Sequence, residues 1–139
     1  YVEDGPLARL YREFPVNSIW EGSGNVMCLD VLRAFGKAPE TRDVLAAELA
    51  LAGTGNAAFN AFSEKLLQDL AQPQDEYGAR RLAERIVVAV QAGLLLRHAP
   101  AFVSGAFVAS RLAHDVGGAY GRLPGGVDCD AILARALAA

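Results

Sequence analysis

The sequence predicts an all-α fold, a helical bundle of six to seven helices. Apolar residues recur at helical spacing along most of the 139-residue chain, and no segment alternates apolar and polar residues as a half-buried strand does. Glycine and proline fall between the periodic segments, where they end helices and form turns. With 53% apolar and 21% charged residues, the chain has the composition of one globular domain with a single core.

The first two helices are separated by a proline. A helix over residues 4–14 ends before Pro15, because proline disfavours the α conformation of the residue that precedes it. The next helix begins near Gly24 and ends at Gly36. Its expected apolar face consists of Met27, Cys28, Val31, Leu32 and Phe35.

Two more helices complete the first half of the chain. One starts with Pro39 or Thr41, runs through Leu51 and is followed by glycines. The other covers residues 56–71. Its predicted buried face consists of Phe59, Phe62, Ser63, Leu66 and Leu70.

The longest helix follows a linker at residues 72–75. Asp75 or a neighbour is expected to cap this helix, which runs to about His98 and ends before Pro100. From Leu82 onward the helix is apolar on nearly all sides, which indicates a central helix with several neighbours.

Two shorter helices are expected near the end of the chain. One covers residues 101–114 and is rich in small residues, which let helix backbones approach closely. The other covers residues 128–137, and the glycine-rich residues 117–126 form the loop between them.

Composition limits the function classes. The net charge of −3 does not indicate binding to nucleic acid or to an anionic membrane. The longest apolar run, residues 86–96, is far shorter than the roughly 20 residues that span a bilayer. Cys28 and Cys129 lack the spacing of a metal site, so we expect two buried thiols, no metal, and a reducing, cytoplasmic location. The start at Tyr1 suggests a cut inside a larger chain.

Residues 16–25 form the segment with the clearest chemical potential. Glu21 can act as a base, and Trp20 supplies a flat wall beside it. The free N–H groups of residues 22–25 can receive anionic oxygens where the next helix opens. The alternative interpretation is a turn in which Glu21 and Ser23 only cap that helix.

The same segment resembles a known family. Residues 8–13 (ARLYRE) followed by residues 19–23 (IWEGS) resemble the C-terminal signature of the acyl-CoA dehydrogenase flavoenzymes. The longer string over residues 17–33 is closer still to the AidB-type branch of adaptive-response DNA alkylation proteins. Residues 110–112 and 117–129 are also similar to that branch, so the resemblance covers most of the chain.

The resemblance implies roles for the motif residues. Glu21 would be the catalytic base that removes the α proton of an acyl-CoA thioester, and Trp20 stands where the family usually has tyrosine beside the flavin. Gly22, Ser23 and Asn25 would line the FAD site, with Ser23 in place of threonine.

The resemblance also implies partners. Family members hold FAD between a β-domain and a helical bundle, so the remainder of the flavoprotein chain is an expected partner and this chain alone would be inactive and would not retain FAD. A homo-oligomer is expected as well. Residues 1–72 would end the family's helical bundle, and residues 73–139 would be the additional helices of the AidB-type branch.

Arginines form a second candidate set. The branch resemblance implies DNA association, and arginines are the expected ligands of phosphate. The candidates are Arg33, Arg80, Arg81, Arg85 and Arg111. The alternatives are a solvated face in which Arg81 and Arg85 pair with Glu84, pairing of Arg33 with Asp30 at i, i+3, and a structural role in subunit packing.

Overall fold

The computed structural model describes residues 2–52, 55–112, 121 and 123–137, and within these ranges the protein is entirely helical. This confirms the predicted all-α fold. The elements are α1 (Pro6–Glu13), the 3-10 helix η1 (Phe14–Ser18), α2 (Gly24–Lys37), α3 (Thr41–Ala50), α4 (Ala57–Leu70), α5 (Ala79–His98), α6 (Ala101–Arg111) and α7 (Cys129–Leu137).

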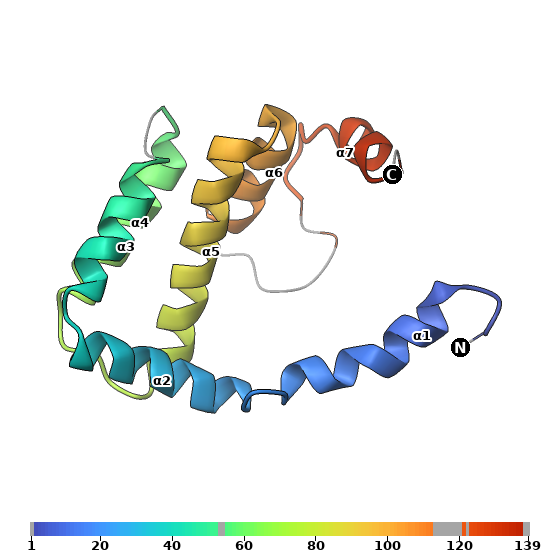
Figure 1. Ribbon diagram of the computed structural model, residues 1–139. Helices are drawn as coiled ribbons and strands as arrows, with labels where there is room; N and C mark the ends of the chain where they lie inside the picture. Colours follow the sequence, from blue (N-terminus) through green and yellow to red (C-terminus); the bar gives the residue numbers. More distant parts are fainter. Residues whose placement is uncertain (1, 53–54, 113–120, 122, 138–139) are drawn as a thin grey trace.

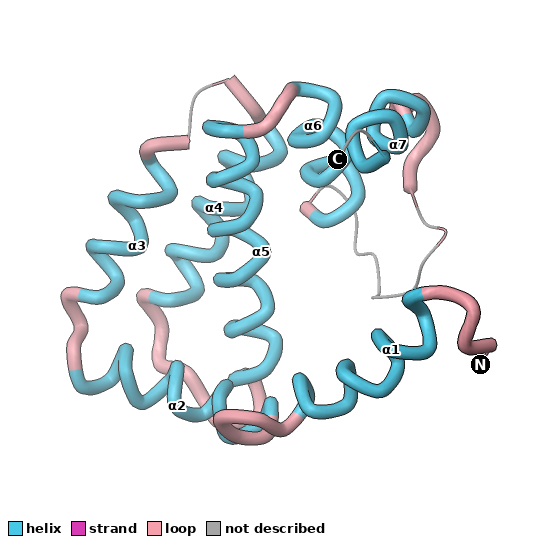
Figure 2. Tube along the Cα trace, turned by 45° about the vertical axis from the view of Figure 1, so that its right-hand side comes forward, coloured by secondary structure: helices cyan, strands magenta, loops and turns pink. Residues whose placement is uncertain are grey.

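Helix α5 is the centre of the molecule. It contacts α2, α3, α4 and α6, while α2 crosses its N-terminal end (Figure 1). Helices α3 and α4 lie side by side next to α5, and α7 contacts α6 (Figure 2). The arrangement confirms the prediction from the apolar surface of α5, because a helix that is apolar on several sides must be covered on several sides.

The core combines residues from both sides of the 72–75 linker. Phe59, Leu66 and Leu70 of α4 are its largest fully buried side chains. Leu82 and Ala89 of α5 belong to the same buried cluster. The linker therefore joins two segments that share one core, and the division at residue 72 remains a prediction about family architecture.

A glycine allows close packing in this core. A Cβ atom on Gly93 of α5 would lie 3.4 Å from the Cβ of Ala52 and 3.5 Å from Cζ of Phe59. These are ordinary van der Waals distances, so the space at Gly93 admits little more than a methyl group, and a larger side chain would have to displace the Phe59 ring.

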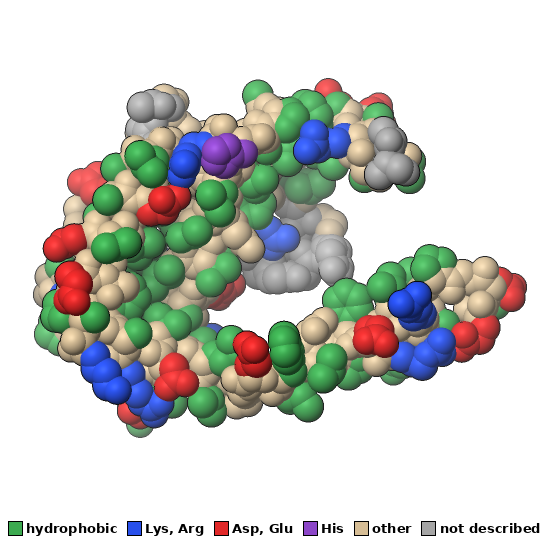
Figure 3. Space-filling model, in the orientation of Figure 1, with side chains coloured by type: hydrophobic (Ala, Val, Ile, Leu, Met, Phe, Trp, Pro, Cys, Tyr) green, Lys and Arg blue, Asp and Glu red, His purple; other side chains and the backbone are tan. Residues whose placement is uncertain are grey.

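The first part of the chain extends away from the other helices. The α-helix ends at Glu13, as expected from Pro15, but the chain continues as a 3-10 helix that contains this proline. The fixed φ of proline is compatible with 3-10 geometry, which explains the continuation. Leu7, Leu10 and Phe14 are exposed along this extension, on which apolar side chains gather in Figure 3.

The starts of α4 and α5 differ in how they are capped. Asn56 caps α4, because its side-chain oxygen accepts a hydrogen bond of 3.0 Å from the Phe59 N–H. The expected cap of α5 by Asp75 or a neighbour is not formed: the N-cap is Gly78, no side chain caps the helix, and Asp75 instead accepts from the Gly78 N–H at 2.7 Å. An aspartate readily closes such a local turn, so it orders the loop before the helix.

The predicted burial of both thiols is also wrong. Cys28 is half-buried on α2, and Cys129 is exposed at the start of α7, because that short helix covers little of the molecule. Residues 113–120 and 122 lie outside the described residues, and with them the end of the 101–114 helix and half of the 117–126 loop.

No helix in the described ranges combines the length and the apolar character needed to cross a membrane.

Candidate functional site

The Trp-Glu-Gly-Ser motif occupies the turn between η1 and α2. The Trp20 N–H donates to the Val16 carbonyl at 2.9 Å, and the Gly22 N–H donates to the Ile19 carbonyl at 3.1 Å. Glu21 has a φ of 63° and Gly22 a φ of 122°. Among the described residues, Glu21 is the only residue other than glycine with a positive φ. The turn therefore holds the glutamate in a left-handed conformation that L-residues rarely adopt.

The side chains of the motif project outward from this turn. Trp20 is 60% exposed and Ile19 is 66% exposed, and Glu21 is exposed beside them without an ion pair among the described residues. Met27, one turn into α2, packs towards Gly22 and is itself half exposed. The motif thus exposes an indole and a carboxylate at consecutive positions, together with the apolar side chains of Ile19 and Met27.

The start of α2 offers backbone donors next to the motif. Ser23 is the N-cap but makes no side-chain capping bond, so the interpretation in which Glu21 and Ser23 only cap the helix lacks its expected hydrogen bond. The Gly22 N–H is already bonded, which corrects the expectation that all four N–H groups are free. Gly24 and Asn25, in the first turn, remain without an intrahelical carbonyl partner, as helix geometry requires.

Arg80 of α5 contacts this helix start. Its guanidinium donates to Oδ1 of Asn25 through Nε at 3.1 Å and through Nη2 at 2.6 Å. Nη2 also lies 3.1 Å from the position that a Cβ atom on Gly24 would take. The structure therefore joins a predicted cofactor residue to a predicted nucleic-acid residue across 55 positions of sequence. Helical periodicity gives no signal for such a contact.

Arg80 lines two cavities. One, of about 520 Å³, is lined by polar and apolar residues that include Asn25, Glu76 and Tyr77. The other, of about 510 Å³, lies in the groove between α2 and α5. Its lining is mainly apolar and includes Gly24, Met27, Cys28, Val31, Val87 and Val88. The motif therefore adjoins space between α2 and α5.

The other candidate arginines are not brought to one surface site. Arg33 pairs with Asp30 on the same helix, as the i, i+3 alternative predicted. Arg85 pairs with Asp69 and not with Glu84. Arg81 and Arg111 are exposed, and neither forms an ion pair among the described residues.

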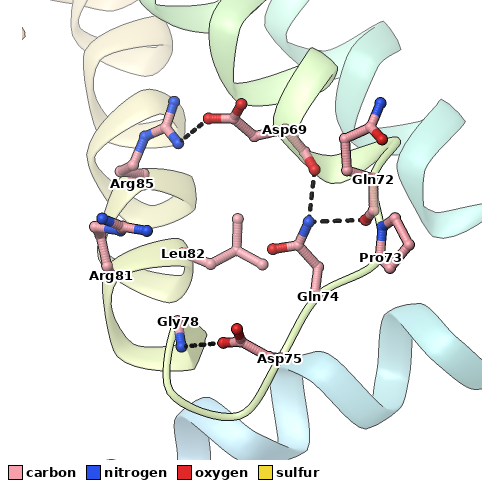
Figure 4. Close-up of a pocket in the computed structure, with 9 residues that line it drawn as sticks. All are labelled: Asp69, Gln72, Pro73, Gln74, Asp75, Gly78, Arg81, Leu82 and Arg85. Carbon is pink, nitrogen blue, oxygen red and sulfur yellow. Dashed lines mark hydrogen bonds and ion pairs between the residues drawn. The ribbon is translucent and has the colours of Figure 1, made fainter.

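A further cavity, of about 280 Å³, lies between the end of α4 and the start of α5 (Figure 4). The side-chain amide of Gln74 donates to the carbonyls of Asp69 at 2.5 Å and Gln72 at 2.8 Å. The Asp69 carboxylate accepts from Arg85 at 2.5 Å on the opposite wall. These groups bond to one another, so they hold the 72–75 linker against the helix pair.

Asp69 is the residue whose acidity this arrangement changes. A hydrogen bond of 2.8 Å from Lys65 and the one from Arg85 lower the pKa of Asp69 below its usual value of 3.8. Both donors are cations that stabilise the carboxylate form. Sequence analysis did not single out Asp69, although the i, i+4 spacing of Lys65 and Asp69 was visible.

Comparison with known proteins identifies relatives of the chain. It is 46% identical over 78 residues to "Putative acyl-CoA dehydrogenase AidB" of Escherichia coli (strain K12), a match that covers 56% of this chain and 14% of that protein. It is 54% identical over 35 residues to "Acyl-CoA dehydrogenase family member 11" of Caenorhabditis elegans, which covers 25% of this chain and 6% of that protein. The chain thus matches only a small part of each relative. No protein-family model matches it. The two matches confirm the resemblance that the motif indicated.

Proposed function

We propose that this chain, which is related to acyl-CoA dehydrogenase family proteins, is the C-terminal helical portion of an FAD-dependent oxidoreductase of the AidB type. In this proposal the turn at residues 20–23 faces the flavin, and Glu21 is the catalytic base. The remainder of the flavoprotein chain supplies most of the cofactor site, so the 139-residue chain alone is inactive.

The conformation of Glu21 is the observation that carries the proposal. A left-handed conformation costs an L-residue about 1–2 kcal/mol, and glycine would avoid this cost. A strained acidic residue beside an exposed indole is typical of a functional site, where strain positions a reacting group. No contact among the described residues explains a preference for glutamate there.

The residues around the turn are suitable for FAD. The exposed face of Trp20 can stack on a planar ring system, and the N–H groups at the start of α2 can donate to cofactor oxygens. When bound, FAD accepts the hydride that leaves the β carbon of an acyl thioester. Glu21 takes the α proton, and the electron pair of that C–H bond forms the new double bond.

The exposed apolar residues of α1 and η1 support contacts with further polypeptide. Leu7, Leu10, Phe14 and Val16 would be covered by the remainder of the flavoprotein or by a second subunit. Sedimentation of the 139-residue chain distinguishes the two, because self-association without the flavin portion supports a subunit contact. We also place the protein in the cytoplasm, where free thiols such as Cys28 and Cys129 persist.

The test of the base is Glu21→Gln in the full-length protein, followed by anaerobic reduction of the flavin with an acyl-CoA. The amide has the shape of the carboxylate but cannot accept the proton, so flavin bleaching should slow by at least about a hundredfold. Glu64→Gln on α4 is the matched control and should bleach at the normal rate. Normal bleaching by the Glu21 variant would exclude the proposed role.

Association with DNA is a second candidate function, favoured by one observation. Arg81 and Arg111 are exposed and form no ion pair among the described residues, so both can bind phosphate. Duplex DNA should bind with an affinity that falls steeply with salt. Replacement of both arginines by alanine should reduce the slope of log affinity against log salt by about two. An unchanged slope would exclude these two arginines as phosphate ligands.

A further inference from the structure

The contact between Arg80 and Asn25 determines how the Asn25 amide is oriented. A guanidinium has only donors, so the atom of Asn25 that faces Arg80 must be the oxygen. Two N–H groups of Arg80 converge on this oxygen at 3.1 and 2.6 Å. The amide NH2 of Asn25 therefore faces away from Arg80, and none of the hydrogen bonds among the described residues uses its two donors.

Gly24 makes the contact possible. The guanidinium lies against the first turn of α2, and a Cβ atom on Gly24 would be 3.1 Å from Nη2 and 3.4 Å from Nη1. A side chain there would push the guanidinium outward and disturb its bonds to Asn25. The preference for glycine here comes from this contact and not from the backbone, since the helical conformation of Gly24 is open to any residue.

We propose that Arg80 is a positioning residue for the cofactor site. It binds the Asn25 oxygen and thereby directs the Asn25 NH2 to donate a hydrogen bond to an acceptor atom of bound FAD. This inference rests on the proposed function, in which the start of α2 faces FAD. It also gives Arg80 a role different from phosphate binding on DNA.

The first test needs no cofactor. Gly24→Ala and Arg80→Ala are made separately and together in the 139-residue chain, and the folding equilibrium constant is measured by urea denaturation. In the Arg80→Ala background, Gly24→Ala should raise that constant about two- to fivefold, because alanine is a better helix residue. With Arg80 present the gain should vanish or reverse. An equal gain in both backgrounds would overturn the contact on which the proposal depends.

The second test measures FAD affinity in the full-length protein by quenching of flavin fluorescence. Arg80→Ala should weaken binding roughly tenfold, the effect of losing about one oriented hydrogen bond. Arg80→Lys should restore part of the affinity, since an ammonium can still donate to Oδ1. Asn25→Asp keeps an oxygen for Arg80 but loses the NH2, so it should also weaken binding about tenfold. Arg135→Ala on α7 is the control for loss of an exposed arginine.

The outcomes separate this inference from the proposed function. Normal FAD affinity of Asn25→Asp would overturn the role of the Asn25 donor, and normal affinity of Arg80→Ala would overturn the role of Arg80. Weakened affinity in these variants, together with normal bleaching by Glu21→Gln, would support the positioning role and exclude only the proposed base.

Discussion

Arg85 of α5 donates a 2.5 Å hydrogen bond to the Asp69 carboxylate of α4, and its guanidinium lies 5.5 Å from the centre of the Phe62 ring. Lys65 binds the other oxygen of the same carboxylate. Asp69 thus connects the end of α4 with the start of α5 at the point where the linker must turn. Because Arg85 pairs with Asp69, it has a structural role and is not an available surface cation.

The Asp69 pairing predicts loss of stability in acid. Its pKa is lowered in the folded protein, so the carboxylate stabilises the fold at pH values above its unfolded pKa near 3.8. That contribution disappears as the pH falls below 3.8 and through the lower folded value. Urea denaturation at pH 7 and pH 3 should show that Asp69→Asn is less stable than wild type at pH 7 and loses less stability on acidification.

Glu84→Gln is the matched control for this experiment. Glu84 is an exposed carboxylate of α5 without an ion pair among the described residues, so the variant should follow the wild-type pH dependence. An Asp69→Asn variant with the same pH dependence as wild type would show that the pairing does not contribute to stability in solution.

Two glycines in helices should respond differently to an added side chain. A Cβ atom on Gly105 of α6 meets no atom within 4 Å, so Gly105→Ala should stabilise the protein by about 0.5–1 kcal/mol. A Cβ atom on Gly93 would make only ordinary van der Waals contacts with Ala52 and Phe59, whereas the larger side chain of Gly93→Ile should destabilise the protein by about 1–3 kcal/mol through overpacking. Thermal denaturation measures both. A stable Gly93→Ile variant would mean that α5 is not packed this closely.

Truncation of the core should be costly at α4. Leu66 is fully buried, so Leu66→Ala should lower the free energy of unfolding by about 2–5 kcal/mol. Leu51 is 62% exposed, and Leu51→Ala should change it by less than about 0.5 kcal/mol. Similar effects of the two substitutions in urea denaturation would contradict the described core.

Helical periodicity was sufficient to predict the fold class and most helices. Of the predicted buried face of α4, Phe59, Ser63, Leu66 and Leu70 are buried, and Phe62 is partly buried against the same core. Periodicity predicts which face of a helix is apolar, but it does not predict whether another element covers that face. Met27 of α2 was therefore expected to be buried, whereas it is half exposed. The turn at Asp75 depends on a local side-chain hydrogen bond that forms in place of a helix cap. Apolar periodicity cannot predict such a bond.

The candidate site was predictable only in part. The motif residues were found from their types and order, whereas the left-handed conformation of Glu21 and the contact of Arg80 with Asn25 could not be read from them. Both depend on how α5 and η1 are placed against α2, which is tertiary information. Sequence reasoning consequently assigned Arg80 to the surface set of arginines.

The strain at Glu21 leads to a last prediction, in which stability and activity change in opposite directions. Glycine adopts a φ of 63° without the steric cost that a Cβ atom imposes, so Glu21→Gly should stabilise the 139-residue chain by about 1 kcal/mol. Glu21→Gln and Glu21→Ala keep the Cβ atom and should leave stability nearly unchanged. Urea denaturation should be monitored by circular dichroism and not by fluorescence, because a substitution at residue 21 would itself change the fluorescence of the adjacent Trp20.

The same variants separate strain from chemistry in the full-length protein. Glu21→Gly and Glu21→Gln should both lose flavin bleaching, although only the first gains stability, because both lack the carboxylate. A gain in stability together with a loss of activity is expected where a site keeps a strained conformation for its chemistry. If Glu21→Gly destabilised the chain instead, the glutamate side chain would be stabilising the turn, and its left-handed conformation would no longer indicate function.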